Sequence, residues 1–119
     1  MTQEDKELLL KDLCARLPYG VIIQIKDWTV LDAELKIGHI NRLQISDVEL
    51  KPYLFPMSSM TEEQKVIYGD LCYSIIQSLA KNMQSELNEL INWLNAHHFD
   101  YRGLIEKGLA IDATNLNIY

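Results

Sequence analysis

The side chains best suited to chemistry lie together in the segment 97–102, which reads His-His-Phe-Asp-Tyr-Arg. Imidazole and carboxylate groups are common metal ligands, and both, like phenol groups, transfer protons in enzymes. Metal ligands on one helix share a face when they are three or four residues apart. His97 and His98 are adjacent and diverge by about 100° on a helix. We therefore predict no metal site at this segment.

The same six residues also fit a structural role, as a corner between two helices. Asp100 would cap a short final helix that ends near Gly108, and Tyr101 would be half-buried. Arg102 would pair with a carboxylate such as Glu106. A small enzyme active site at this corner remains a lower-ranked alternative, built on His97, His98, Asp100, Tyr101 and Arg102.

Other motifs of catalysis are absent from the sequence. Nucleophilic catalysis needs a serine or cysteine beside a base and an orienting group, and no serine lies in a GxSxG-like turn. The five glycines are scattered and form no phosphate-binding loop. His39 lies in a strand-like pattern, where we expect a surface or edge position. We predict no catalytic residue, no cofactor and no small-molecule ligand.

The charge of the chain disfavours polyanionic partners. The net charge is −6, with 11 basic and 17 acidic residues, and no segment forms a basic patch. Nucleic acids and anionic membranes are bound through clustered Lys and Arg. The alternative of a nucleic-acid-associated accessory protein would use the small sheet described below, with Trp28, Tyr53 and Phe55 as a base-stacking platform. The acidic balance favours these aromatics as core residues.

The two cysteines, Cys14 and Cys72, belong to no CxxC motif. Both lie in apolar helical patterns, and we expect them to be reduced and mostly buried. The first residues, MTQEDKELLL, are acidic and lack the apolar run of a signal peptide. No stretch approaches the roughly 18 apolar residues of a membrane span. These observations predict a cytoplasmic protein.

Periodicity predicts an α+β fold in one domain over residues 1–119. Thr2 and Asp5 have the spacing of a capping box, and the apolar steps that follow predict an N-terminal helix over 1–18. Residues 19–57 predict a small bent antiparallel sheet of three to five strands, either a meander or an SH3-like partial barrel. Its strands would include 21–26, 33–40 and a last one at 48–55, which Pro52 restricts to an edge. Asn41-Arg42 would be a turn, and Leu43 and Ile45 would continue the alternation.

Residues 61–110 form the predicted helical region. Thr61 and Gln64 make a second capping box, and the strongest apolar stripe of the chain follows it. One unbroken helix to His97 would be about 54 Å long, so either the helix breaks, at Gly69 or at Lys81-Asn82, or it protrudes and packs on a second subunit. A broken helix would fold into a hairpin. The stripe is the predicted interaction surface and comprises Cys72, Ile75, Ile76, Leu79, Met83, Leu87, Leu90, Ile91 and Leu94. The last residues, 111–119, would be a loose tail or an added edge strand.

Three stretches together resemble a known family. They are KELLLKDLCARLPYGV at 6–21, KPYLFPMSSMTEEQK at 51–65 and WLNAHHFDYRGLIEKGLA at 93–110. The family consists of small uncharacterised proteins from Bacteroides-type gut bacteria and their phage-like elements. The resemblance implies a bacterial cytoplasmic setting and a role linked to mobile elements, and it implies no activity, cofactor or catalytic residue.

The sequence as a whole favours a non-enzymatic module that binds another protein or itself, for example as a homodimer. This expectation depends on the apolar stripe, because exposed apolar surface of that length marks interaction sites.

Overall fold

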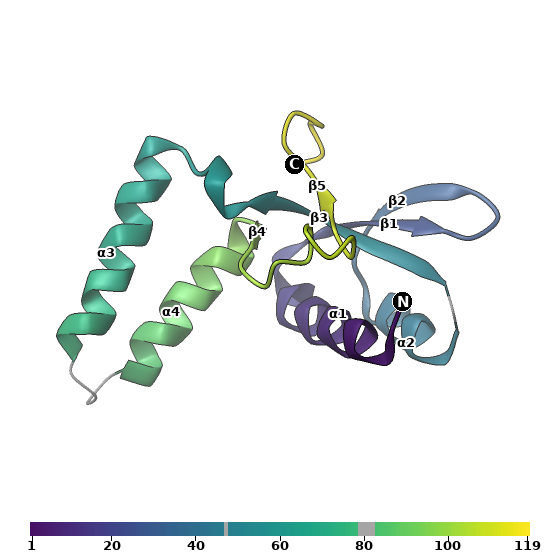
Figure 1. Ribbon diagram of the computed structural model, residues 1–119, viewed down its shortest axis with the longest axis horizontal. Coiled ribbons are helices and arrows are strands. Elements are labelled where there is room, and N and C mark those ends of the chain that lie inside the picture. The colour runs from purple at the N-terminus through teal and green to yellow at the C-terminus, as the bar shows by residue number, and fades with distance from the viewer. Residues whose placement is uncertain (47, 79–82) are drawn as a thin grey trace.

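The computed structural model describes residues 1–46, 48–78 and 83–119. Two short 3-10 turns, Leu17–Tyr19 and Met57–Ser59, follow the first helix and the third strand. The α+β class with an N-terminal helix is confirmed. No helix within the described ranges is long and apolar enough to cross a membrane. The elements follow one another (Figure 1) as α1 (Gln3–Arg16), β1 (Ile22–Lys26), β2 (Val30–Glu34), α2 (Ile37–Ile45), β3 (Glu49–Pro56), α3 (Glu62–Ser78), α4 (Met83–Ala96), β4 (Phe99–Asp100) and β5 (Ile111–Asp112).

A mixed sheet is the framework on which the helices pack. β1 pairs antiparallel with β2 and with β3, so that Ile23 lies opposite both Ala33 and Pro52. Residues 53–56 of β3 pair in parallel with β5 and β4. The strand order is β2-β1-β3-β4, with β5 also beside β3. The parallel strands and the helix between β2 and β3 replace the all-antiparallel meander or partial barrel that the sequence predicted.

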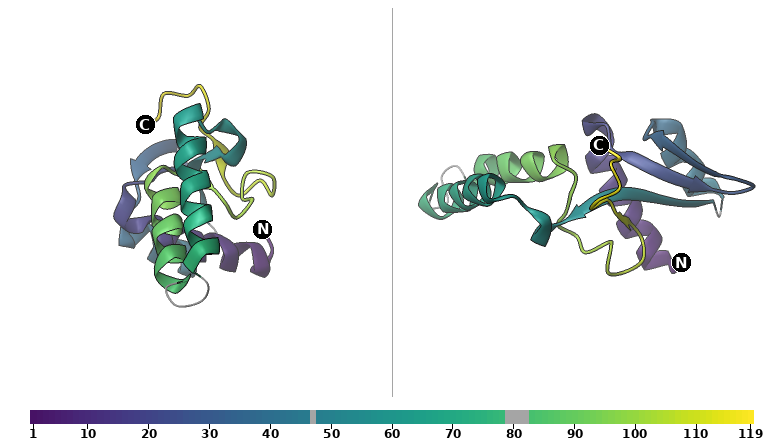
Figure 2. Two further views of the ribbon diagram at one scale, coloured as in Figure 1. Left: turned by 90° about the vertical axis from the view of Figure 1, so that its left-hand side faces the viewer. Right: turned by 90° about the horizontal axis from the view of Figure 1, so that it is seen from above.

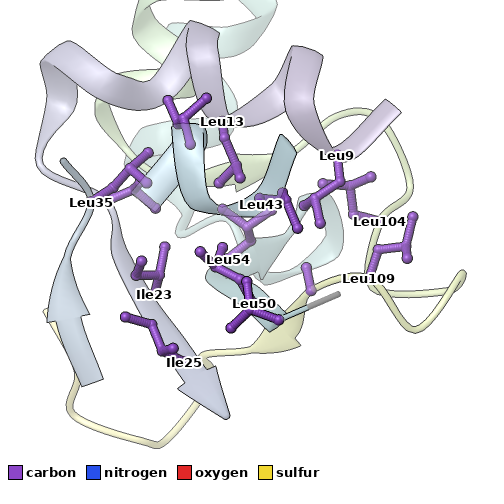
Figure 3. Close-up of a cluster of buried hydrophobic side chains, with 14 residues drawn as sticks. Leu9, Leu13, Ile23, Ile25, Leu35, Leu43, Leu50, Leu54, Leu104 and Leu109 are labelled. Atoms are coloured by element: carbon purple, nitrogen blue, oxygen red, sulfur yellow. The ribbon is translucent and has the colours of Figure 1, made fainter. Parts of the chain in front are cut away.

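Helices α1 and α2 cover one face of this sheet and close the main core. Alternate residues of β1 and β3 point into it, as strand geometry requires. Leu9 and Leu13 of α1 and Ile40 and Leu43 of α2 pack against them. Figure 3 shows the leucines and isoleucines of the sheet and helices converging, with Leu104 and Leu109 from the C-terminal segment completing the cluster.

Helices α3 and α4 form an antiparallel hairpin that projects from the sheet (Figures 1 and 2). It makes the molecule elongated, with extents of 50 × 30 × 23 Å. A second cluster at its base comprises Met60, Leu90, Leu94 and Phe99. Of the predicted break points, Gly69 lies within α3, and Lys81-Asn82 lies outside the described residues. The hairpin alternative is therefore the one observed.

Side-chain caps start the helices where the sequence predicted. Thr2 Oγ1 accepts the Asp5 N–H at 3.1 Å at the start of α1. Thr61 Oγ1 accepts the Gln64 N–H, and Gln64 Oε1 accepts the Thr61 N–H, at 3.2 and 2.9 Å. Both predicted helix starts are confirmed.

The segment predicted as the strand 33–40 and its continuation is mostly helix. Only its first two residues belong to β2, and α2 takes up residues 37–45, so the predicted turn at Asn41-Arg42 lies inside a helix. His39 provides one physical reason, because its Nδ1 accepts the Lys36 N–H at 2.9 Å and so satisfies an unpaired donor at the helix start. Ile40 and Leu43, three residues apart, then face the core together.

Two further predictions are corrected. Pro52 was expected on an edge strand, but it lies in β3, which has partner strands on both sides. The parallel partners of β3 begin only at Tyr53, so the N–H that proline lacks is not needed for a hydrogen bond to them. Residues after β4 form turns instead of a final helix. For residues 111–119, the alternative of an added strand is observed at the start of the segment, as β5.

The cysteines differ from each other in exposure. Both are free thiols, but Cys14 is exposed and Cys72 is half-buried. The expected burial of Cys14 is therefore wrong, and the physical reason is that α1 buries Asp12 and Arg16 beside its leucines. The buried face of α1 therefore includes Asp12 and Arg16 and does not include Cys14.

We predict two kinetic classes of thiol in the folded protein. Cys14 should react with a thiol-reactive dye at nearly the rate of a free thiol, and Cys72 more slowly, because access limits reaction with a half-buried sulfur. Stopped-flow labelling measures both phases. Cys14→Ser should remove the fast phase and Cys72→Ser the slow one, and loss of the fast phase in the Cys72 variant would contradict the assignment.

Candidate functional site

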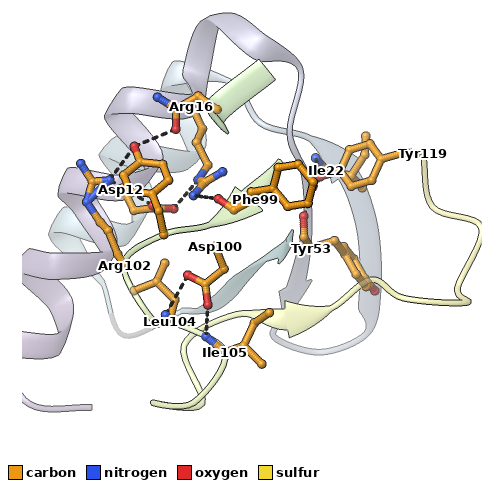
Figure 4. A network of polar contacts seen from close by, with 12 residues as sticks. Asp12, Arg16, Ile22, Tyr53, Phe99, Asp100, Arg102, Leu104, Ile105 and Tyr119 are labelled. Atoms are coloured by element: carbon orange, nitrogen blue, oxygen red, sulfur yellow. Dashed lines mark hydrogen bonds and ion pairs between the residues drawn. The ribbon is translucent and has the colours of Figure 1, made fainter. Parts of the chain in front are cut away.

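A buried ion pair lies where the predicted polar corner meets α1 (Figure 4). Arg16 and Asp12, one helical turn apart on α1, have side chains that are 0% exposed. Arg16 Nε donates to Asp12 Oδ2 at 2.8 Å, and Nη2 donates to the carbonyl oxygen of Phe99 at 2.7 Å. Burial raises the pKa of Asp12, against the attraction of Arg16 and Arg102. The pair ties α1 to β4 across the sequence.

Tyr101 and Arg102 extend this network toward the surface. Arg102 Nη1 donates to Asp12 Oδ1 at 3.3 Å and to the Tyr101 hydroxyl at 3.0 Å. The Tyr101 hydroxyl donates to Asn95 Oδ1 at 2.8 Å. The guanidinium carbons of Arg16 and Arg102 lie 5.2 and 4.8 Å from the centre of the Tyr101 ring. Tyr101 is half-buried as predicted, whereas Arg102 pairs with Asp12 and not with Glu106.

Asp100 holds a turn, not the start of a helix. Its two carboxylate oxygens accept the N–H groups of Leu104 and Ile105, both at 2.9 Å. This side chain borders a hollow of about 560 Å³ at the base of the hairpin. Both of its oxygens are already occupied by backbone donors, so Asp100 is poorly placed to act as an acid or base on a ligand.

The two histidines point to different neighbours. The ring of His97 packs on Trp93 at 4.8 Å, and the ring of His98 stacks on Tyr119 at 3.9 Å. His98 has a φ of 62°, which is a left-handed backbone conformation, so His98 does not continue the helix α4. Within the described ranges, no group of three His, Cys, Asp or Glu side chains is arranged to hold a metal ion.

Tyr119 joins the corner to the sheet. Its hydroxyl accepts the Ile22 N–H at 2.9 Å and donates to the carbonyl oxygen of Tyr53 at 2.7 Å. Burial raises the pKa of Tyr119 to about 12. Burial, Arg16 and His97 lower the pKa of His98 to about 4. The corner therefore connects α1, the hairpin and the sheet, and its polar groups are used mainly for structure.

The predicted apolar stripe is divided by the hairpin. Leu90 and Leu94 are buried and contribute to the cluster at its base, together with partly buried Cys72, Ile75 and Ile91. Leu87 is half-buried, and Leu79 lies outside the described residues. Ile76 and Met83 are exposed. The stripe is thus not one exposed surface, because folding α4 back on α3 covers most of it.

The exposed face of the hairpin is formed by apolar residues of α3, of which only Ile76 belongs to the predicted stripe. Val66, Tyr73 and Ile76 of α3 are 63%, 62% and 66% exposed. The residues of α3 that pack with Leu90 and Leu94 of α4 are instead Tyr68, Leu71, Cys72 and Ile75. Gly69 lies between Val66 and Tyr73. We call Val66, Gly69, Tyr73 and Ile76 the outer face of α3. This face could be found in the sequence as a second series at steps of three and four residues in the same helix, but the predicted stripe was the longer pattern.

We predict that Asp12→Ala lowers the free energy of unfolding by about 3–5 kcal/mol, because it leaves the buried Arg16 cation without its partner. The matched control is Lys11→Ala, at the exposed neighbouring position, which should change stability by less than about 0.5 kcal/mol. Urea unfolding followed by circular dichroism measures both. Equal effects of the two substitutions would contradict the role of the pair.

We also predict that His98 makes the protein less stable in acid. The unfolded chain takes up the His98 proton near pH 6.5, whereas the folded chain does so only near pH 4. Stability from this group is therefore complete above pH 6.5 and is lost as the pH falls toward 4. The pH dependence of urea unfolding should flatten over this window in His98→Phe and persist in His97→Phe. An unchanged slope in His98→Phe would reject the prediction.

Comparison with protein-family models, curated proteins and solved structures gave no significant match.

Proposed function

We propose that the protein is an accessory module that binds another protein, or a second copy of itself, through its α3–α4 hairpin. The observation that carries this proposal is the exposure of Val66, Tyr73 and Ile76 on the outer face of α3. Apolar side chains that line one face of a projecting helix are a common anchor for helical partners. The resemblance to gut-bacterial and phage-like proteins favours a bacterial setting.

The polar corner supports binding over catalysis. Its carboxylates, Asp12 and Asp100, are held by guanidinium or backbone donors. The ring of His98 is stacked on Tyr119, and its Nδ1 is buried without a hydrogen-bond partner in the described part of the chain. These groups stiffen the base of the hairpin. A rigid base presents the outer face of α3 at a fixed angle to the sheet, as a recognition element requires.

A site-specific photo-crosslinker tests the proposal. We predict that benzoylphenylalanine in place of Tyr73 gives discrete adducts of higher mass in cells that express the chain. The matched control is the same group in place of Trp28, an aromatic residue that is 97% exposed in the β1–β2 turn, far from the hairpin. Equal adduct formation at the two positions, or none at Tyr73, would refute the hairpin as the binding element.

A further inference from the structure

The outer face of α3 has the spacing of a coiled-coil seam. Val66, Gly69, Tyr73 and Ile76 follow one another at steps of three, four and three residues, the a-d-a-d pattern of a heptad repeat. All four positions are exposed. A seam this narrow fits one further helix that runs nearly parallel or antiparallel to α3.

Gly69 is unexplained by the packing of the chain itself. It lies inside α3, where glycine lowers helix stability relative to alanine. A methyl group at this position would meet no atom of the described residues within 4 Å. The glycine therefore leaves a shallow gap between Val66 and Tyr73, which lets a second helix approach closely.

The charges beside the seam specify how that helix runs. Lys65 lies at position g on one flank, and Asp70 lies at position e on the other, five residues later. In parallel coiled coils, a g residue of one helix meets the e residue five positions later on the other helix. Two copies of α3 in parallel would thus form two Lys65–Asp70 ion pairs. In the single chain, Lys65 reaches Glu62 at 3.1 Å in a solvent-exposed pair, which is weak and easily exchanged.

An antiparallel arrangement is disfavoured by the same charges. Antiparallel helices bring each flank against the same flank of the other helix, so Asp70 would approach Asp70 of the second copy. Like charges in such positions are destabilising. Charge complementarity therefore selects the parallel arrangement.

We infer that the outer face of α3 binds a second copy of this chain, as a parallel two-helix seam with reciprocal Lys65–Asp70 pairs. The inference rests on the proposed function and adds the identity and orientation of the partner. In Figures 1 and 2, α3 lies at one end of the molecule, so a second copy can approach it from outside.

A charge exchange tests the parallel pairing. Sedimentation equilibrium of the full chain at about 1 µM to 1 mM covers the affinities of weak dimers. Lys65→Glu and Asp70→Lys should each raise Kd about ten- to thirtyfold, since each loses two attractive pairs and creates two repulsive ones. The double variant should return Kd to within about threefold of the original. A mixture of the two single variants should form a heterodimer, because every pair across its seam is then opposite in charge.

The possible results distinguish failure of the parallel dimer from failure of the proposed binding function. The inferred parallel dimer would be overturned by a monomer throughout the concentration range. It would also be overturned by a dimer whose Kd is unchanged in Lys65→Glu and Asp70→Lys. Benzoylphenylalanine adducts at Tyr73 with a different protein would still support a binding hairpin in that case. Circular dichroism of each variant checks that it is folded before its Kd is compared.

Disulfide trapping gives a second readout that needs no charge change. In a background with Cys14→Ser and Cys72→Ser, Val66→Cys should form a dimer under mild oxidation, because a parallel seam places the two copies of position 66 within bonding distance. Ile76→Cys should do the same at the other end. Crosslinking of Val66→Cys only with Ile76→Cys of another copy would instead reveal antiparallel helices, because the two ends of the seam would then meet, and would overturn the inference.

Discussion

The structure depends on the buried guanidinium of Arg16. A buried cation is tolerated where a charged partner and hydrogen-bond acceptors replace water. Arg16 has Asp12 of its own helix as the charged partner and the carbonyl oxygen of Phe99 as a second acceptor. Phe99 follows directly after the hairpin, so the pair fixes the end of the hairpin against α1. Arg102 and Tyr101 then enclose the pair from the solvent side. One polar contact thereby joins segments that lie far apart in the sequence.

This anchor explains why the hairpin projects. Its base is held by Arg16 on one side and by the Met60, Leu94 and Phe99 cluster on the other. With α4 fixed at this end, its apolar residues pack against α3 and in the cluster at the base. The apolar residues on the outer face of α3 have no element of the described chain to cover them. The exposed face is therefore a consequence of the same geometry that stabilises the corner.

Short-range signals predicted the fold better than long-range ones. Thr2, Thr61 and Gln64 mark helix starts through bonds to near neighbours, and these were predictable. The segment around His39 was misassigned, because a histidine that accepts its own helix-start N–H looks, in sequence, like one member of an alternating strand. The burial of Asp12 gave no signal in the sequence, since it depends on Arg16 and on Phe99, a residue 83 positions after Arg16. The exposure of the predicted interaction stripe could not be derived from the sequence for the same reason, because the pairing of α3 with α4 decides which apolar side chains are exposed.

The forces on the outer face of α3 act over different ranges. Partial burial of Val66, Tyr73 and Ile76 would contribute about half of the 1.5–3 kcal/mol that full burial of each side chain gives. Summed over two copies, this is similar to the several kcal/mol that association costs, so any complex through this face is weak. A net charge of −6 on each copy adds repulsion, which salt screens beyond about 10 Å. The Lys65–Asp70 pairs act at shorter range and contribute orientation more than affinity. Raising the salt concentration should consequently strengthen association until the local pairs are screened as well.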